Sequence, residues 1–462
     1  MFQVESRAKM ASLPRNYPEK FYDVVVQVAI IRPGPIVGKM MHPYMRRRQK
    51  KEEVSYPHPS LEPVLKRTLG VPLFQEQLLR MAMVVANFTG AEAEELRRAV
   101  GMRRSWERMK NLEGRLRSGM TANGIDAATQ ETIIQNISSF ALYGFPESHA
   151  ASFALIAYAS AYLKLKYLAA FTCAILNNQP MGFYMPAVLV KDAQRHGLRV
   201  KPMDVQMSEW ACTIEREPND SLSLRLGLGY AKGLRQQSAE AIARSREECG
   251  PFRSAEDLVT RVPSLNRKDL TLLARIGALN WLDGIEHRRE ALWQVERAGK
   301  QEGPLLRQQN EVLREESASS PLRKMSTEER LVADYAGTGL TIGKHPMEYR
   351  RAELRRKKVL SAEELRTRRN GEFVRTAGCV IARQRPGTAM GFIFLSMEDE
   401  TGIANVIVTP DLYERERLVV TRSKFILAEG PLQNQDGVIH IKATHLRPLS
   451  DQTLEVRSHD FH

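Results

Sequence analysis

Apolar residues recur at the spacing of an α-helix over the first part of the chain. From Lys20 to about Leu176 the helical segments are separated by turn signals such as Arg32-Pro33-Gly34-Pro35. Proline and glycine interrupt the 3.6-residue period and so mark the loops between helices. The pattern predicts one all-α domain, which we assign to residues 1–185.

The most apolar stretch of the chain runs from Ala150 to Leu176 and carries Lys164 and Lys166 in its middle. Charged residues at such positions are costly inside a lipid bilayer. We therefore expect a buried core helix and no association with a membrane.

A second helical region, from about Leu226 to Trp281, is built of short units joined by glycine turns. Residues 226–233 (LGLGYAKG) precede one helix-forming run, and residues 262–265 (VPSL) precede another. These units suggest two helix-hairpin-helix motifs in a connector over residues 186–290. Such hairpins present backbone N–H groups to a phosphate without reading the base. An ordinary helical hairpin explains the pattern equally well.

Residues 291–370 are predicted to join this region to the last domain. Between about Arg297 and Glu328 the chain is charged, rich in glutamine and without periodicity, as in a linker or a frayed helix. A basic cluster follows, formed by Arg350, Arg351, Arg355, Arg356, Lys357 and Lys358.

The pattern changes to that of β-strands from Phe373 to Leu449. Five short apolar segments and a helix-like insert near Leu412 fit a Greek-key barrel of the OB type over residues 371–450, before a tail at 451–462. The predicted strands cover residues 374–381, 391–399, 402–408, 425–430 and 438–443. The predicted fold class is therefore multidomain α+β: an all-α domain, a helix-hairpin-helix region and a C-terminal OB-type barrel.

The charge of the chain indicates a polyanionic partner. Among 462 residues, 68 Lys and Arg face 54 Asp and Glu, a formal net charge of +14. Such an excess attracts nucleic acid at long range. The four cysteines are far apart and form no C-x-x-C pair, and the N-terminus has no apolar signal region, so we expect a reducing, cytoplasmic location.

No complete catalytic site is visible in the residue pattern. Asp-x-Asp, a Walker loop, a G-x-S-x-G elbow and an H-E-x-x-H helix are all absent from the sequence. The nearest acidic cluster, Glu398-Asp399-Glu400-Thr401-Gly402, lies between two predicted strands, where a tight turn explains it better than a metal site. We therefore assign no catalytic residue and no metal ligand.

Two polar clusters in the helical domain are candidates for binding. Residues 96–104 (LRRAVGMRR) place two arginine pairs at a helix end without acids on the same stretch, which suits a triphosphate or a duplex backbone, although a solvated basic face has the same pattern. In residues 143–150 (YGFPESHA), Ser148 is a candidate N-cap and His149 either contacts a ligand or is structural. Arg32 lies in a rigid turn that either faces a phosphate or only shapes the loop.

Five ordered motifs in the first 150 residues resemble those of bacterial C-family DNA polymerases. They are residues 2–7 (FQVESR), 31–35 (IRPGP), 73–77 (LFQEQ), 96–101 (LRRAVG), and 143–145 (YGF) followed by Ser148-His149. Val4, His42-Pro43-Tyr44 followed by three arginines, and the ending SHDFH at 458–462 are similar to the error-prone branch of that family, the damage-inducible paralogues of the replicative alpha subunit.

The resemblance implies fingers at about 1–185, tandem helix-hairpin-helix units at 186–290 and an OB domain near 370–450. The PHP domain and the palm, whose aspartates hold the catalytic Mg²⁺, would lie before Met1, so the chain alone is expected to be inactive. It implies nucleotide contacts for Arg97, Arg98, Arg103, Arg104, Arg32 and His149. It implies DNA contacts for Gly229, Lys232, Gly233, Arg235, Arg355, Arg356, Phe392 and Phe394.

The implied partners are primer-template DNA, single-stranded template, deoxynucleoside triphosphate, a sliding clamp and accessory proteins of damage-induced synthesis. Residues 309–313 (QNEVL) are a weak match to a clamp-binding pentapeptide, and Gly233-Leu234-Arg235 departs from the plain Gly-x-Gly hairpin. Two other classes stay open: a stand-alone, non-catalytic DNA-binding accessory protein, and a tRNA-binding OB protein, which the order of the five motifs disfavours.

Overall fold

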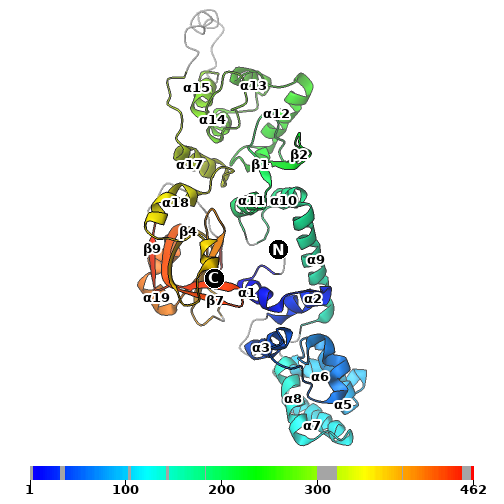
Figure 1. Cartoon of the computed structure of the whole chain (residues 1–462). Coiled ribbons are helices and arrows are strands. Elements are labelled where there is room, and N and C mark those ends of the chain that lie inside the picture. Colours follow the sequence, from blue (N-terminus) through cyan, green and yellow to red (C-terminus); the bar gives the residue numbers. More distant parts are fainter. Residues whose placement is uncertain are drawn as a thin grey trace, which may run out of the picture. The chain divides into compact units, whose positions relative to one another are not determined.

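A computed structural model describes residues 4–31, 37–101, 106–141, 145–182, 184–298, 320–387, 389–449 and 459–461. The chain divides into two compact units (Figure 1). One comprises residues 1–162 with 435–438, and the other comprises residues 163–434 with 439–462.

The first unit is helical, as the apolar spacing predicts. Its helices are α1 (Arg7–Asn16), α2 (Phe21–Ile30), α3 (Val37–Arg48), α4 (Glu62–Leu65), α5 (Gln75–Ala86), α6 (Gly90–Gly101), α7 (Trp106–Ala122), α8 (Ala127–Ala141) and α9 (Glu147–Lys166), of which residues 163–166 are assigned to the second unit.

Two apolar cores hold the first unit together. One joins α5, α6, α7 and α8 and includes Met81, Met120 and Ile133, which are fully buried. The other surrounds α2 and includes Val26 and Phe74. Removing such side chains from water is the main favourable contribution to folding.

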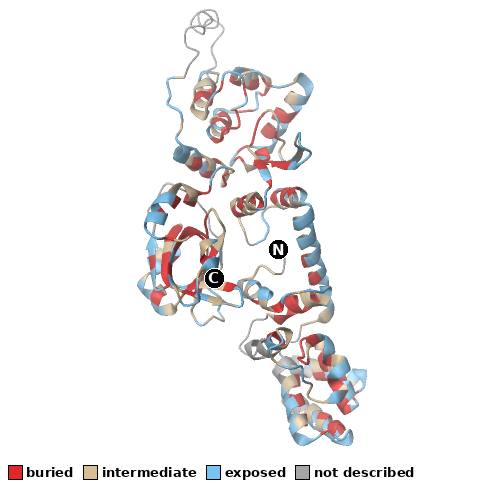
Figure 2. Cartoon of the chain, in the orientation of Figure 1, coloured by how far each residue is buried: buried red, intermediate tan, exposed pale blue. Residues whose placement is uncertain are grey.

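Helix α9 differs from the expected buried core helix. Leu155 is 60% exposed and Tyr158 is 54% exposed, and Figure 2 shows much of α9 as exposed. The prediction of a buried helix over Ala150–Leu176 is therefore wrong, because a chain bend of 120° separates α9 from α10 (Leu168–Asn177). Among the described residues no single helix is long and apolar enough to cross a membrane, although this bent pair passes that test together.

The second unit contains the connector helices and the strands, apart from the turn between two C-terminal strands at residues 435–438. Its helices are α10, α11 (Pro186–Arg195), α12 (Gln236–Cys249), α13 (Ala255–Arg261), α14 (Arg267–Ile276), α15 (Arg288–Ala298), α17 (Thr327–Thr338), α18 (Pro346–Arg356), α19 (Pro410–Arg415) and α20 (Arg417–Arg422). A small sheet in the order β1-β3-β2 is formed by β1 (Arg199–Lys201), β2 (Thr213–Arg216) and β3 (Leu222–Arg225).

The C-terminal strands pair in a closed ring, as expected for an OB-type fold. The ring runs β4-β5-β6-β8-β7 and returns to β4; the pairs β4–β5, β5–β6 and β4–β7 are antiparallel, and β6–β8 is parallel. Its strands are β4 (Phe373–Gln384), β5 (Ile393–Glu398), β6 (Ile403–Val408), β7 (Phe425–Gln435) and β8 (Val438–Lys442). The short strands β9 (His445–Pro448) and β10 (His459–Phe461) add to β7 and β4.

One glycine is required where the ring is tightest. A Cβ at Gly430 would lie 2.1 Å from the carbonyl oxygen of Lys442 on β8. No side chain fits there without moving the backbone, so the close approach of β7 and β8 depends on glycine.

Polar contacts join α11 to the rest of the second unit. The buried Lys191 ammonium donates to the Gly343 carbonyl and, at 2.8 Å, to Gln194 Oε1, while Gln194 donates to the Ile342 carbonyl at 2.8 Å. Arg195 lies 2.7 Å from Glu398 at the end of β5. These bonds fix α11 against the loop before α18 and against the barrel.

The turn between β5 and β6 is held by the Asp399 carboxylate. One of its oxygens accepts hydrogen bonds from Thr401 N, Thr401 Oγ1 and Gly402 N, and the other accepts from Ala362 N and Arg351. This set of donors agrees with the turn interpretation of residues 398–402. Arg351 also pairs with Glu400, so this residue of the basic cluster is a buried structural partner.

Replacing Arg351 with Ala should destabilise the barrel by about 3 kcal/mol, because it leaves buried carboxylates without their cation. Faster hydrogen exchange in peptides from β5 and β6 would show the loss. Arg355→Ala, on the exposed side of the same helix, is the control and should change stability by less than about 0.5 kcal/mol. Equal exchange in the two variants would contradict the structural role of Arg351.

Burial lowers the pKa of Lys191 to about 8. Between that value and the ordinary lysine pKa the unfolded state binds more protons, so the free energy of unfolding should rise with pH. From pH 7 to 9.5 the wild type should gain about 2 kcal/mol relative to Lys191→Met. Thermal melts of both proteins across this range measure the difference, with Lys268→Met, an exposed lysine, as control. A difference in stability between the wild type and Lys191→Met that does not change with pH would refute the prediction.

Candidate nucleic-acid interface

The first hairpin leaves the start of a helix open to solvent. It runs from the short helix Leu228–Tyr230 through Gly233 to α12. Gly233 has a φ of +91°, the left-handed conformation that favours glycine. The N-cap residue Arg235 provides no side-chain hydrogen bond to the helix, and Gln236 and Gln237 are exposed. The first N–H groups of α12 therefore point outward as donors, which suits an anion.

The second hairpin is closed by its own side chains. Asn266 accepts from Asp269 N at 3.0 Å, and the Asp269 carboxylate accepts from Asn266 N at 3.2 Å, which forms a capping box at the start of α14. The carboxylate also places negative charge where a phosphate would bind. The two hairpins therefore differ, and only the first has the chemistry of a phosphate site.

The predicted hairpin residues mostly make contacts within the protein. Arg235 donates to the Ser264 carbonyl at 2.5 Å and lies 3.6 Å from Asp269, so it joins the two hairpins. The Lys232 ammonium donates to the carbonyls of Tyr335 and Ala336 at the end of α17. A Cβ at Gly229 would meet Trp210, which explains that glycine by close packing. Their predicted DNA contacts stay predictions.

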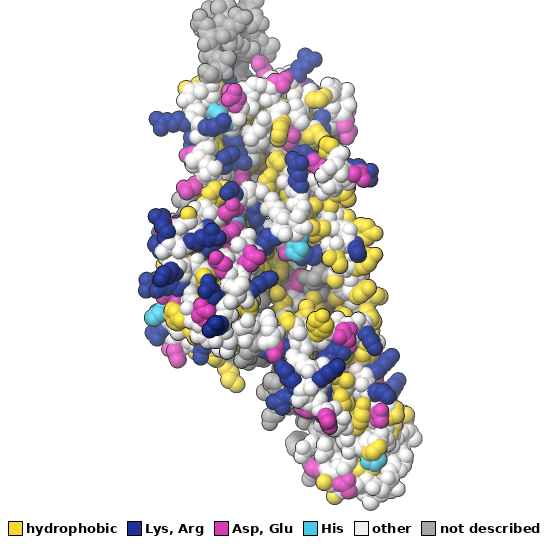
Figure 3. Space-filling model, in the orientation of Figure 1, with side chains coloured by type: hydrophobic (Ala, Val, Ile, Leu, Met, Phe, Trp, Pro, Cys, Tyr) yellow, Lys and Arg dark blue, Asp and Glu magenta, His cyan; other side chains and the backbone are white. Residues whose placement is uncertain are grey.

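The barrel residues predicted to contact DNA lie at or near the surface. Phe394, on β5, is half-buried, as is Phe392 just before that strand. Nearby, the Arg385 guanidinium lies 5.0 Å from the centre of the Tyr413 ring. Arg355 and Arg356 are exposed at the end of α18. Figure 3 shows Lys and Arg side chains gathered over this part of the second unit.

In the first unit, α6 carries an acid that the sequence interpretation missed. Glu94 accepts from Arg97 Nε at 2.9 Å and Nη2 at 2.7 Å, and from Arg98 Nε at 3.2 Å. These bonds, chiefly that of Arg97, lower the pKa of Glu94 to about 2. The expectation of an arginine group without acids is therefore wrong for this pair. The i, i+3 and i, i+4 spacing was visible in the sequence.

The remaining nucleotide candidates are only partly described. His149 is exposed and lies between Phe145, at 5.2 Å between ring centres, and Phe153, at 4.3 Å. Ser148 lies inside the first turn of α9 and is not its N-cap. Arg32, Arg103, Arg104 and the 309–313 segment lie outside the described residues.

Within the part of the chain that the structure describes, no group of three or more His, Cys, Asp or Glu side chains is arranged to hold a metal ion. The described residues thus assemble donors for phosphate and none of the acidic clusters that bind Mg²⁺.

Comparison with known proteins identifies the two helical regions. Residues 1–124 match the model of the bacterial DNA polymerase III alpha subunit finger domain, and residues 197–291 match a helix-hairpin-helix motif. The whole chain is 46% identical to the error-prone DNA polymerases of Alkalilimnicola ehrlichii and of Pseudomonas syringae pv. tomato. A solved asparaginyl-tRNA synthetase from Pyrococcus horikoshii matches 20% of this chain and 22% of its own at 22% identity, with a TM-score of 0.17.

The match covers different fractions of this chain and of its relatives. It includes 100% of this chain but 44% of each of these two relatives, so the chain spans less than half of their length. Over its whole length the sequence is therefore similar to a C-terminal part of the bacterial error-prone DNA polymerases.

Proposed function

We propose that this chain is the part of an error-prone, DNA-directed DNA polymerase that binds primer-template DNA and the incoming nucleotide during damage-induced synthesis. The similarity to error-prone polymerases along the whole chain carries the proposal. The net charge of +14 and the open start of α12 supply the physical basis for DNA binding.

The reaction is nucleotidyl transfer, in which the primer 3′-hydroxyl attacks the α-phosphate and pyrophosphate leaves. Mg²⁺ would stabilise the negative charge that develops on the phosphates. The carboxylates that would hold it lie outside the described residues of this chain. The residues of this chain bind and orient. The α12 N-terminus holds a backbone phosphate, and the barrel stacks unpaired template bases on aromatic side chains.

Arg98 is a better candidate than Arg97 for binding the incoming nucleotide. Arg97 makes two bonds to Glu94 through its Nε and Nη2 atoms, whereas Arg98 makes one, at 3.2 Å, and its side chain is 69% exposed. Neighbouring helical positions also point about 100° apart. Arg98 can therefore turn to a triphosphate with the smaller loss of internal contacts.

A stand-alone, non-catalytic DNA-binding protein is the second candidate, because an open hairpin and an OB-type barrel are able to bind DNA without chemistry. A sliding clamp and accessory proteins of damage-induced synthesis are further proposed partners. The two candidates are separated by testing whether this chain supports primer extension when the remaining part of a relative is supplied. A part of a polymerase needs that remaining part, whereas an accessory protein does not.

Replacing Gln237 with Glu should weaken binding to duplex primer-template by about three- to tenfold, because the new carboxylate repels phosphate at the open start of α12. Fluorescence anisotropy at several salt concentrations measures the dissociation constant. For both proteins log K should fall steeply with log salt, by about 0.9 for each phosphate neutralised.

Asn219→Asp is the matched control for this substitution. It makes the same change in charge in an exposed turn, and the new carboxylate can still accept from Ser221 N and Oγ. Its affinity for duplex should stay within twofold of the wild type. Equal weakening by both variants would mean that total charge, and not the start of α12, governs binding.

The 462-residue chain alone should not extend a primer with Mg²⁺ and all four deoxynucleotides, because its described residues hold no cluster of carboxylates for two metal ions. Extension should appear when the remaining part of a relative is supplied. Incorporation by the chain alone, in a preparation free of host polymerase, would overturn this proposal.

In such a reconstituted enzyme, Arg98→Ala should lower incorporation efficiency about 10- to 150-fold, since a charge-assisted contact to phosphate contributes roughly 1.5–3 kcal/mol. Arg97→Ala should have a smaller effect, and DNA affinity should change little in either variant. Single-turnover incorporation at varied nucleotide concentration measures the difference. If both variants lose DNA affinity with normal nucleotide dependence, these arginines hold the DNA backbone.

A further inference from the structure

Helix α9 exposes an apolar stripe within the first unit. Leu155, Tyr158 and Tyr162 lie at i, i+3 and i+7, so they share one face of the helix. Their residues are 60%, 54% and 48% exposed, and Ile156 on a neighbouring face is 47% exposed. Figure 3 shows hydrophobic side chains gathered along α9. A helix that is apolar on all sides is normally covered.

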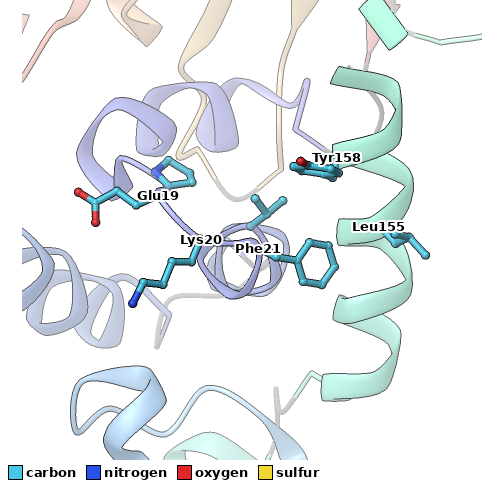
Figure 4. A pocket seen from close by; sticks show the side chains of 7 residues that line it. Glu19, Lys20, Phe21, Leu155 and Tyr158 are labelled. Carbon is cyan, nitrogen blue, oxygen red and sulfur yellow. The ribbon is translucent and has the colours of Figure 1, made fainter. Parts of the chain in front are cut away.

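The stripe borders a cavity of about 630 Å³ between α9 and the start of α2. Its walls include Phe21, Val24, Leu155 and Tyr158. Figure 4 shows Phe21 and Tyr158 directed toward one another from the two helices, and their rings meet edge to face at 6.2 Å between centres. This cavity and the stripe together form a continuous apolar surface, which we call the α9 surface: Phe21, Val24, Leu155, Tyr158 and Tyr162.

The chemistry of the α9 surface fits polypeptide better than nucleic acid. A single strand binds through flat rings that stack on bases and through cations that meet each phosphate. Here Val24 and Leu155 are aliphatic, and the opposite charges of Glu19 and Lys20 beside them leave the cavity without an excess of positive charge for phosphate. Aliphatic and aromatic side chains around a cavity, with charges at its edge, are typical of the core and rim of a protein interface.

The length of the relatives identifies the polypeptide. This chain matches 44% of the Alkalilimnicola ehrlichii polymerase over its own whole length, so 56% of that protein is further polypeptide. We infer that the α9 surface is the docking site for this remaining part of an error-prone polymerase, which inserts apolar side chains into the cavity beside Phe21 and Tyr158. The inference rests on the family assignment and does not require that the chain binds DNA.

The test uses this chain and the remaining 56% of the Alkalilimnicola ehrlichii polymerase, each expressed and purified by itself. Isothermal titration of the two should give a stable complex in the absence of DNA. A triple variant, Leu155→Ser with Tyr158→Ser and Tyr162→Ser, should bind at least tenfold more weakly. Tyr158→Phe should bind like the wild type, because it keeps the apolar ring.

The matched control is Met207→Ser with Leu222→Ser and Leu418→Ser, which removes three exposed apolar side chains from the second unit. It should keep wild-type affinity, and circular dichroism should show native melting for all variants because the changed residues are exposed. Tyr162→Cys in a Cys249→Ser background, labelled with an environment-sensitive dye, should report burial when the complex forms.

Four results would overturn the inference. In the first two, the wild type and the triple variant bind the remaining part equally, or neither protein binds it. The triple variant would lose affinity for an oligothymidylate while polypeptide binding was absent, which would make the surface a stacking platform. The wild type would form dimers that the triple variant does not, which would make a second copy the occupant. Normal complex formation without DNA binding would instead contradict only the proposed function.

Discussion

The second unit depends on the ion pairs around the turn that joins β5 and β6. Glu398 pairs with Arg195 of α11, and Asp399 pairs with Arg351 of α18 while it accepts the backbone N–H groups of the turn and of Ala362. Because these carboxylates are buried, removing one cation lowers the free energy of unfolding by more than the intact ion pair contributes to it. One barrel turn therefore ties the barrel to the helices before it.

The two hairpins of the same unit differ in chemistry. At α14 the helix donors are used by Asn266 and Asp269, whereas at α12 no side chain caps them. Arg235 and Lys232, the cations nearest the open hairpin, donate to carbonyls of the protein. The proposed phosphate contact at the first hairpin therefore falls to backbone N–H groups, which do not read base sequence.

Several features could be predicted from the sequence because they depend on local spacing. The five barrel strands and the insert after β6 follow from alternation and turn residues, and the helix-hairpin-helix region follows from its glycines. The capping box of Asn266 and Asp269 and the pairing of Glu94 with two arginines were also local signals, but their consequence for anion binding was not drawn. Predicted contacts with nucleotide and DNA stay predictions.

The sequence by itself determined the helical and strand segments, the positive charge and the family resemblance, since these depend on residue types a few positions apart. Only the tertiary structure decided which groups are available. It bends the chain after α9, so an apolar segment that was expected in the core has an exposed face, and it buries Arg351 against acids 48 and 49 residues away. Burial and pairing arise between residues distant in sequence, and spacing along one segment carries no information about them.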